Sequence, residues 1–274
     1  MQKKWFLWFI YHHPLGIPFL WIFRMSWFSR MMGGIFMTPY SRYLIGLLMR
    51  VYDIKLETYQ VPHDWFTSVN DFFIRSSREN FRIFPQDGRT LWSPVDGCIQ
   101  IFQSISRADD FSIKWYRANL DQLFWPKISD FVGWDVCFCR LRFSDYHRFH
   151  FFDAWKILTS DFRNGPLYSV DASVLDTGLW VQNKSNCILF HTHNFWNVLM
   201  LEVGATNVWS IIQNKNSGDE FFRWEEKWYF QLWWSAVLLV FQKGIIHWNQ
   251  KILKESLQWN ECEVMAGQEI GVAY

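Results

Sequence analysis

The hydrophobic pattern divides the chain into two parts, and the first is an apolar, aromatic segment over residues 5–37. Basic residues punctuate this segment, and Pro14 and Pro18 interrupt it, so it has no continuous apolar run of 18 residues. Such a segment is more typical of one lying in a membrane interface than of a spanning helix. No small-residue cleavage site follows, which disfavours a signal peptide. Core helices packed on the rest of the domain are the competing interpretation.

Apolar residues at helical spacing predict a helix over 40–52. A second, short helix is predicted over 64–75, with Ser68 and Asp71 suited to its start. Helices followed by strands predict an α+β fold: N-terminal, membrane-facing helices over 1–60 and a β-rich catalytic core over 61–274. In the core, short apolar runs rich in Val, Ile and aromatic residues predict strands over 98–103, 134–143, 197–203, 207–213, 235–242 and 244–248.

Composition narrows the class of protein and exposes one anomaly. With a net charge of +1 the chain has no overall positive potential that would attract nucleic acid, and no nucleic-acid-binding motif is present. Five cysteines predict reduced thiols in a cytosolic compartment, with Cys137 and Cys139 on one face of a strand. The anomaly is 19 Trp against 14 Gly, whereas ordinary usage of about 7% would give roughly 19 Gly.

Three short segments carry residues that could perform chemistry. Asp96 lies in the turn SPVDG, His147 and His150 lie in DYHRFH, and Ser235 opens an apolar run. Asp, His and Ser are the parts of an orienter, base and nucleophile, although Ser235 lacks the GxSxG elbow of an α/β-hydrolase. A turn aspartate and hydrogen-bonded structural histidines are the plainer interpretation of the same residues.

Metal binding is disfavoured at the histidines. His147 and His150 form an HxxH pair without a third close ligand, which is a weak metal signal. His191 and His193 have the same ambiguity. The sequence therefore predicts no metal site.

Several segments together resemble the phosphatidylserine decarboxylases, especially the shorter bacterial kind. DYHRFH and VGATNV are the most specific, and the order and spacing of all the segments agree with that family. The matching stretches are SVNDFFIR (68–75), SPVDG (93–97), DYHRFHF (145–151), PLYSV (166–170), LEVGATNV (201–208) and EEKWYFQLWWSAVLLVF (225–241).

The resemblance implies an enzyme that processes itself. Ser235 would attack the carbonyl of Trp234, and β-elimination of the resulting ester would leave a β chain, 1–234, and an α chain, 235–274, that starts with a pyruvoyl group. His150 would be the base and Asp96 its orienter. The pyruvoyl cofactor would form a Schiff base with phosphatidylserine and act as electron sink for loss of CO2. His147 would return a proton to carbon.

The resemblance also implies the partners and the location. The substrate would be a phospholipid, and the protein would lie peripherally on the cytoplasmic face of the cell membrane, with its aromatic N-terminal region at the lipid surface. The α and β chains would form a heterodimer, and a higher oligomer stays open. Arg148 is a candidate for the substrate phosphate by chemistry alone.

The chain departs from the family pattern where Trp stands in place of Gly. Turns and close backbone approaches favour Gly, and independent mutations would not all choose the bulkiest residue. We therefore expect UGA codons that its own cell reads as glycine, and we expect a chain made with two indoles before Ser235 to process slowly or not at all. The departures lie at Trp196, Trp209, Trp224, Trp228, Trp233 and Trp234.

Three alternatives stay open from the sequence. The first is a homologue that cannot process itself and binds lipid without catalysis. The second is a Ser hydrolase built on Asp96, His150 and Ser235 that leaves the chain intact. The third is a membrane-anchored structural protein, which leaves the DYHRFH and VGATNV matches unexplained.

Overall fold

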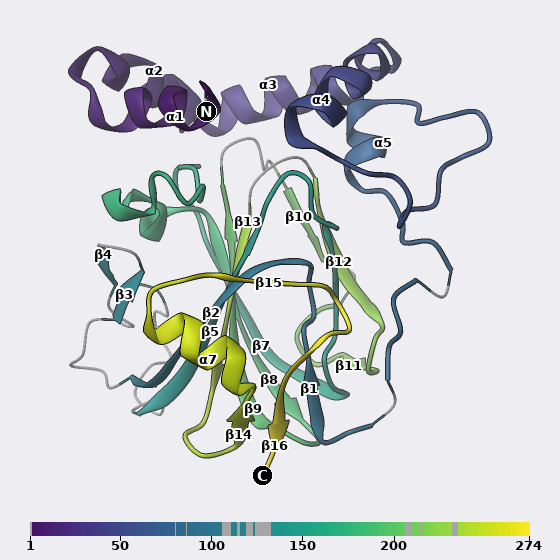
Figure 1. Ribbon diagram of the computed structural model, residues 1–274, viewed down its shortest axis with the longest axis vertical. Helices are drawn as coiled ribbons and strands as arrows, with labels where there is room; N and C mark the ends of the chain where they lie inside the picture. Colours follow the sequence, from purple (N-terminus) through teal and green to yellow (C-terminus); the bar gives the residue numbers. More distant parts are fainter. Residues whose placement is uncertain are drawn as a thin grey trace.

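The computed structural model has helices first and strands afterwards, so the α+β prediction is confirmed (Figure 1). The positions Trp209, Trp233 and Trp234 lie outside the described residues. The structure describes residues 2–79, 81–85, 87–105, 111–113, 116–118, 123, 133–205, 210–213, 215–231 and 235–274.

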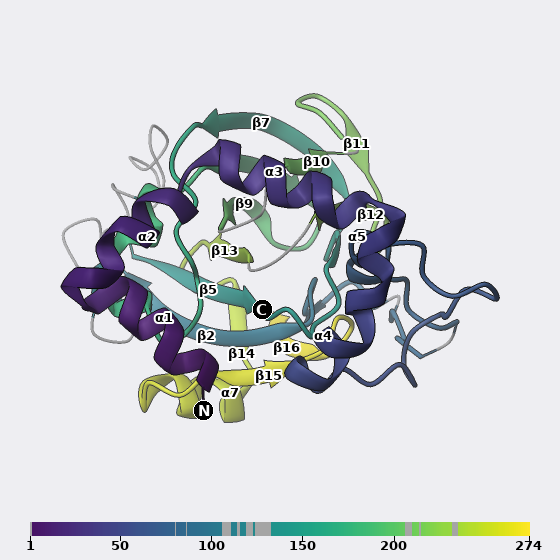
Figure 2. The same cartoon turned by 90° about the horizontal axis from the view of Figure 1, so that it is seen from above.

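The N-terminal helices follow one another around one end of the β core (Figures 1 and 2). One helix is predicted over 40–52, but a 3-10 segment that begins at Pro39 forms its first half; such turns are frequent at helix N-termini. The described helical segments are α1 (Gln2–His12), η1 (Pro14–Gly16), α2 (Ile17–Phe23), α3 (Ser26–Met37), η2 (Pro39–Leu44), α4 (Ile45–Tyr52), α5 (Val69–Phe73), the 3-10 turns η4 (Leu175–Thr177) and η5 (Leu179–Gln182) and, near the C-terminus, α7 (Gln250–Leu257).

Helix α5 is shorter than the predicted 64–75 but begins as the sequence indicates. The Ser68 side chain accepts a hydrogen bond from the amide of Asp71 at 3.1 Å, and the Asp71 carboxylate accepts one from the amide of Thr67 at 2.8 Å. These reciprocal bonds satisfy amides that a helix start leaves without partners. Phe72 and Phe73 are fully buried, so the cap fixes an aromatic face against the core.

The strands form one large antiparallel sheet and smaller ones. The large sheet has eight strands in the order β11-β7-β8-β9-β13-β5-β2-β15, beside the sheets β1-β16-β14, β10-β12-β6 and β3-β4. Their bounds are β1 (Thr90–Trp92), β2 (Gly97–Ile105), β3 (Phe111–Ile113), β4 (Tyr116–Ala118), β5 (Trp134–Leu141), β6 (Arg148–His150), β7 (Trp155–Arg163), β8 (Ser185–Thr192), β9 (Trp196–Gly204), β10 (Ser210–Gln213), β11 (Glu220–Phe221), β12 (Glu226–Gln231), β13 (Ser235–Phe241), β14 (Ile246–Trp248), β15 (Cys262–Val264) and β16 (Glu269–Ala273).

Strand β13 lies inside the large sheet and is buried on both faces. Val237 and Leu239 belong to one hydrophobic cluster, whereas Leu238 and Val240 belong to another on the opposite face. Side chains alternate between the two faces of a strand, so a continuous apolar run fits a strand that is covered on both sides. Cys137 and Cys139 of β5 lie on one face as predicted, with their Sγ atoms 3.7 Å apart, and all five cysteines are free thiols.

The helical layer α1–α4 is tied to the core by polar contacts. Arg24 donates to the hydroxyl of Tyr168 at 2.9 Å, and the amide of Leu167 donates to the carbonyl of Arg24 at 3.0 Å. The amide of Val69 donates to the side chain of Ser41 at 2.9 Å. The layer is therefore docked on the core at several points along its length.

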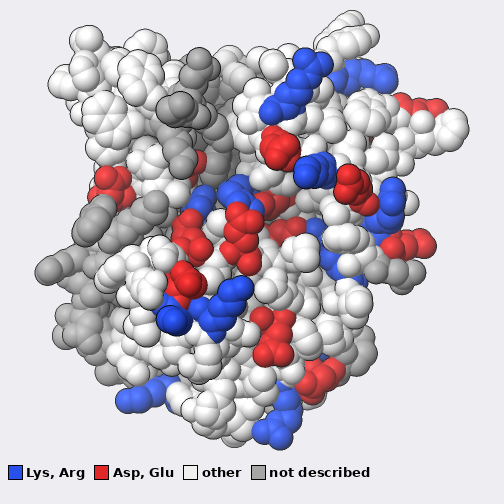
Figure 3. All heavy atoms as spheres, in the orientation of Figure 1, with Lys and Arg blue, Asp and Glu red and all other residues white. Residues whose placement is uncertain are grey.

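Much of the helical layer is apolar and exposed. Figure 3 shows the part formed by α1 and α2 with little charge, while acidic and basic residues gather over the β core. Within the described residues no single helix is long and apolar enough to cross a membrane, although residues 5–12 and 14–23 together are, with a 92° bend between them. The exposed side chains include Trp5, Phe6, Trp8, Leu15, Ile17, Phe19, Trp21, Ile22, Trp27, Met31 and Ile35.

Candidate active site

Ser235 is the first residue of β13 and lies at the end of the sheet that faces the helical layer (Figure 1). It pairs with Leu141, the last residue of β5, and with Gly204, the last of β9. Ser235 is fully buried, and its Oγ has no hydrogen-bond partner among the residues that the structure describes. Among the described residues, therefore, nothing engages this hydroxyl, although a buried hydroxyl normally has a hydrogen-bond partner.

Asp96 is held in a tight turn against the C-terminal part of the chain. Gly97 follows it with φ +150°, and a Cβ there would lie 2.5 Å from the carbonyl oxygen of Arg140, so only glycine fits. The amide of Ala266 donates to Asp96 Oδ1 at 2.7 Å. The turn SPVDG therefore contacts residues on the far side of Ser235 in the sequence.

The Asp96 carboxylate is paired with Arg82 and not with His150. Arg82 Nε donates to Oδ1 at 3.2 Å, and Arg82 Nη2 donates to Oδ2. Both side chains are buried, so this two-point ion pair is shielded from water. The direct hydrogen bond that the orienter role implies is not formed, because His150 directs Nδ1 to the carbonyl of Trp224 while Asp96 is bonded by Arg82 and the amide of Ala266.

His150 has a partner at each ring nitrogen. Nδ1 lies 3.0 Å from the carbonyl oxygen of Trp224, which can only accept, so Nδ1 carries the proton. Nε2 then offers its lone pair to the hydroxyl of Tyr146 at 3.1 Å. Burial lowers the pKa of His150 below its usual value. The ring is therefore a neutral base whose lone pair is covered by one phenol.

His147, three residues before His150 in DYHRFH, stacks on Phe73 of α5, with ring centroids 3.9 Å apart. Its Nε2 donates to the carbonyl oxygen of Arg142 at 2.8 Å, while Nδ1 has no partner among the described residues. Burial, with Arg75 nearby, lowers the pKa of His147 to about 3. The ring is neutral and its single proton is already engaged, which does not favour the acid role that the resemblance implies.

Arg148 contributes to the wall of a neighbouring cavity of about 350 Å³, which Asp71, Ile74 and Arg75 also line. Its guanidinium donates to the carbonyl oxygen of Ile74 at 3.0 Å and to the carboxylate of Glu226 at 2.7 and 3.0 Å. A phosphate at Arg148 would have to compete with this acidic partner. The phosphate role therefore stays a prediction.

Sequence reasoning missed Arg82 and Tyr146. Tyr146 lies inside DYHRFH, so the motif itself marked it, and its ring centroid is 4.2 Å from the guanidinium carbon of Arg82. Arg82 lies in no motif, and its pairing with Asp96 joins residues 14 apart on either side of β1. Together these contacts connect Asp96 to His150 through Arg82 and the phenol of Tyr146.

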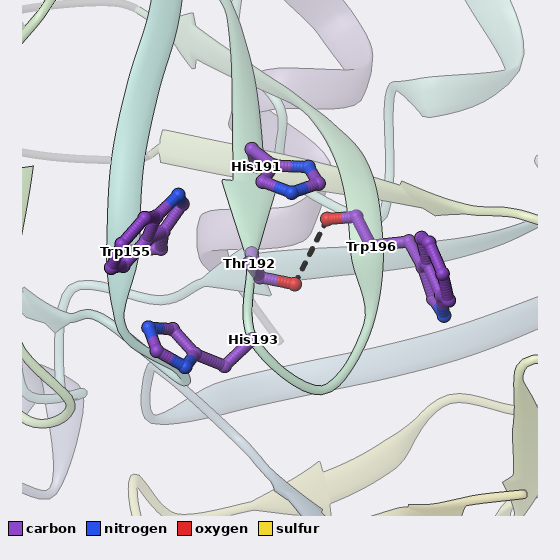
Figure 4. Close-up of a pocket in the computed structure, with 5 residues that line it drawn as sticks. All are labelled: Trp155, His191, Thr192, His193 and Trp196. Carbon is purple, nitrogen blue, oxygen red and sulfur yellow. Dashed lines mark hydrogen bonds between the residues drawn. The ribbon is translucent and has the colours of Figure 1, made fainter.

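His191 and His193 line a pocket on β8 between Trp155 and Trp196 (Figure 4). His191 Nδ1 lies 2.8 Å from Asn197 Oδ1, and His193 packs edge-on against Trp155 at 4.7 Å. No group of three or more His, Cys, Asp or Glu side chains suited to a metal occurs in the described part of the chain.

Comparisons with known proteins identify relatives over nearly the whole chain. The sequence profile of the family "Phosphatidylserine decarboxylase" matches residues 69–272. A phosphatidylserine decarboxylase proenzyme of Clostridium kluyveri is 31% identical over 99% of this chain and 93% of its own length. Proenzymes of the same description are 34% identical in Ruminiclostridium cellulolyticum, over 75% of this chain and 70% of their own, and 31% in Chlamydia caviae, over 90% and 84%.

Proposed function

The chain belongs to the phosphatidylserine decarboxylase family, which makes it a carboxy-lyase, and we propose that it converts phosphatidylserine to phosphatidylethanolamine and CO2 after cutting itself before Ser235. The observation that carries the self-cleavage is the buried Ser235 Oγ, which has no hydrogen-bond partner among the described residues. Because no described group engages this hydroxyl, we infer that it is available to attack the carbonyl of the residue before it.

Ser235 also fits the origin of a pyruvoyl group. As the first residue of β13 it would become the N-terminus of the α chain, with its backbone held by β5 and β9. A pyruvoyl group there would supply the electron sink for loss of CO2. The pairing partners on both sides would keep this end in place within the sheet.

His150 is the base in this proposal. Its Nε2 carries the lone pair, and the lowered pKa keeps it neutral at pH 7, the form that can accept the proton of a serine hydroxyl. Tyr146 covers that lone pair and must give way for the transfer. Asp96 acts on His150 through Arg82 and Tyr146, which makes these two positioning residues.

The location of Ser235 suits a lipid substrate. The start of β13 faces the helical layer (Figure 1), whose outer surface carries Trp5, Trp8 and Trp21 at about half exposure or more. Aromatic side chains of this kind favour the region of the lipid headgroups. We place the protein peripherally on the cytoplasmic face of the membrane, a compartment that agrees with its five free thiols.

The experiment compares the chain as written with the double variant Trp233→Gly/Trp234→Gly, each incubated with phosphatidylserine vesicles. Intact mass reports cleavage, and released CO2 reports activity. We expect the double variant to split between residues 234 and 235, to gain a pyruvoyl end and to release CO2. Ser235→Ala in the double variant should stay one chain and release none, whereas Ser185→Ala, another fully buried strand serine, should still cleave.

The outcomes separate the alternatives. An intact double variant that binds vesicles and releases no CO2 identifies a lipid-binding homologue without catalysis. An intact chain that a fluorophosphonate probe labels at Ser235 identifies a Ser hydrolase. Either result overturns the proposed mechanism.

A further inference from the structure

Tryptophan occupies several backbone positions of the described chain where glycine is the usual residue. Seven non-glycine residues of the described chain have positive φ, and five of them are Trp. Bulky side chains rarely adopt this conformation, because Cβ meets the neighbouring carbonyl groups, whereas glycine adopts it freely. The five are Trp65 (φ 66°), Trp155 (143°), Trp196 (57°), Trp224 (67°) and Trp259 (64°).

Trp259 stands at the glycine position of a helix-ending motif. After α7, the amide of Trp259 donates to the carbonyl of Ser256, and the amide of Asn260 donates to the carbonyl of Glu255, both at 3.0 Å. This pair of bonds defines the Schellman motif, in which the residue after the C-cap is left-handed and is usually glycine. The hydrogen bonds fix the conformation whatever residue stands there.

Trp224 stands at the third position of a β-turn. The amide of Glu225 donates to the carbonyl of Phe222 at 3.1 Å, which makes Trp224 the residue i+2. A positive φ at that position is the property of type II turns that requires glycine or asparagine. The amide of Trp224 is held as well, by the carbonyl of Phe151 at 2.8 Å.

Trp196 ends the connection between β8 and β9. It pairs with Thr192 across the hairpin, and Thr192 Oγ1 donates to its carbonyl at 2.9 Å (Figure 4). Trp196 directly follows the three residues of this connection, and its φ of 57° is the left-handed conformation for which glycine is preferred. Three different local motifs thus ask for the same residue.

Four of the five indoles contribute little to the core, whereas that of Trp224 is half-buried, packs on Phe84 and donates to the carbonyl of Pro85 at 2.8 Å. These four are more than a third exposed, at 37% to 65%. By contrast, Trp248 is buried and donates from Nε1 to Asp135 at 2.7 Å, and Trp180 is buried against Phe138. The indoles of Trp180 and Trp248 are thus part of the core, whereas at the four exposed positions the backbone conformation sets the requirement.

We propose that residues 65, 155, 196, 224 and 259 are glycine in the protein that its own cell makes, encoded by UGA codons that this cell reads as glycine. The family pattern marked only Trp196 and Trp224 of these, and the backbone adds Trp65, Trp155 and Trp259. The same exchange accounts for 19 Trp beside only 14 Gly. It requires no change in the fold, since glycine adopts each observed φ.

The proposal changes the interpretation of two sites. Trp155 and Trp196 form walls of the pocket beside His191 and His193 (Figure 4), so with glycine at both positions the pocket loses these walls and is not a ligand site. The contact of His150 persists, because its partner at residue 224 is a backbone carbonyl.

Two direct measurements test the proposal. In the gene, we expect UGA codons at all five positions and UGG at Trp180 and Trp248. Peptide mass spectrometry of the protein purified from its own cells should show glycine at the five and tryptophan at the two. A UGG codon, or a tryptophan-containing peptide, at position 196, 224 or 259 overturns the proposal.

The premise that Trp at these positions strains the backbone can be tested on recombinant chains. The test is the sign of the change in Tm when each Trp is replaced by Gly. Trp259→Gly, Trp224→Gly and Trp196→Gly should each keep or raise Tm, since strain is relieved where φ is positive. The matched controls Trp248→Gly and Trp180→Gly remove buried indoles and should lower Tm by many degrees. Comparable losses of Tm in both groups would contradict the premise.

Discussion

The helical layer and the β core place their large apolar side chains in opposite directions. In the layer, Trp5 is 65% and Trp21 53% exposed, whereas in β13 the residues from Val237 to Phe241 are almost completely buried. Burial of apolar area is the main source of folding free energy. The core therefore uses its hydrophobic residues to fold, while the layer keeps much of its apolar surface available for contact with something outside the chain.

One fully buried ion pair of the core, Lys227 with Glu202, provides the largest predicted effect on stability. Lys227 and Glu202 are both fully buried and paired, so Lys227→Met leaves a buried carboxylate without its cation. We expect a loss of about 3–5 kcal/mol in the free energy of unfolding, measured by urea denaturation. The control Lys215→Met removes the partly exposed pair with Glu225, 2.8 Å long, and should cost at most about 1 kcal/mol. Equal losses would remove the contrast between core and surface.

Acid should destabilise the core through His147. Its folded pKa of about 3 lies below the unfolded value of about 6.5, so the unfolded state binds more protons between these pH values. Stability is full above pH 6.5 and falls toward pH 3, with a loss on the order of 3 kcal/mol by pH 4. In denaturation curves across this range His147→Gln should flatten the decline. His63→Asn, at an exposed histidine, should leave it unchanged.

Tyr146 should influence the pH dependence of cleavage more than stability. Its hydroxyl donates to the lone pair of His150 and so favours the neutral ring. We add Tyr146→Phe to the Trp233→Gly/Trp234→Gly variant and expect the acid limb of its cleavage rate to move to higher pH by about 0.5–1 unit, the size of one lost neutral hydrogen bond. Tyr168→Phe removes a phenol that bonds Arg24 and should leave the profile in place. A shift of equal size in that control would contradict the role of Tyr146.

The helical layer should show the smallest effect on stability and the clearest effect on binding. Replacing Trp5, Phe6 and Trp8 by Gln changes exposed positions, so each should alter the free energy of unfolding by less than about 0.5 kcal/mol. Sedimentation with anionic vesicles should nevertheless fall markedly. The control replaces three exposed apolar residues outside the helical layer, Phe222, Leu257 and Met265, and should retain binding. Unchanged sedimentation of the first variant would show that the layer serves another contact.

The elements that the sequence predicts well are those buried on both faces. The run from Ala236 to Phe241 predicts β13 because every residue in it is apolar. The structure buries every one of these positions. Strand β7 was missed: its sequence, WKILTSDFR, mixes polar and apolar residues, and many of its side chains are at least partly exposed. Helix α7 was missed as well, since its eight residues lie among short strand-like runs. Periodicity reports burial, so partly exposed elements give a weak signal.

The residue types of the candidate site follow from the sequence, but its contacts do not. His147 and His150 are three apart, but no helix joins them: His147 directly precedes the strand β6 and its ring packs on Phe73, whereas that of His150 bonds Tyr146. Asp96 was predicted to orient His150, whereas Arg82 takes its carboxylate. Pairings of this kind depend on how distant loops meet, which local pattern does not encode.

The position of β13 between β5 and β9 has a consequence for the life of the protein after cleavage. The segment after Ser235 also pairs β15 with β2 and β16 with β1, so a cut at its start would leave the two pieces interleaved. Once unfolded, however, they would be separate molecules, and refolding would become a second-order encounter while unfolding stays first-order. The mature enzyme would then persist because it opens slowly, and its recovery from denaturant would depend on concentration where that of the uncut chain does not.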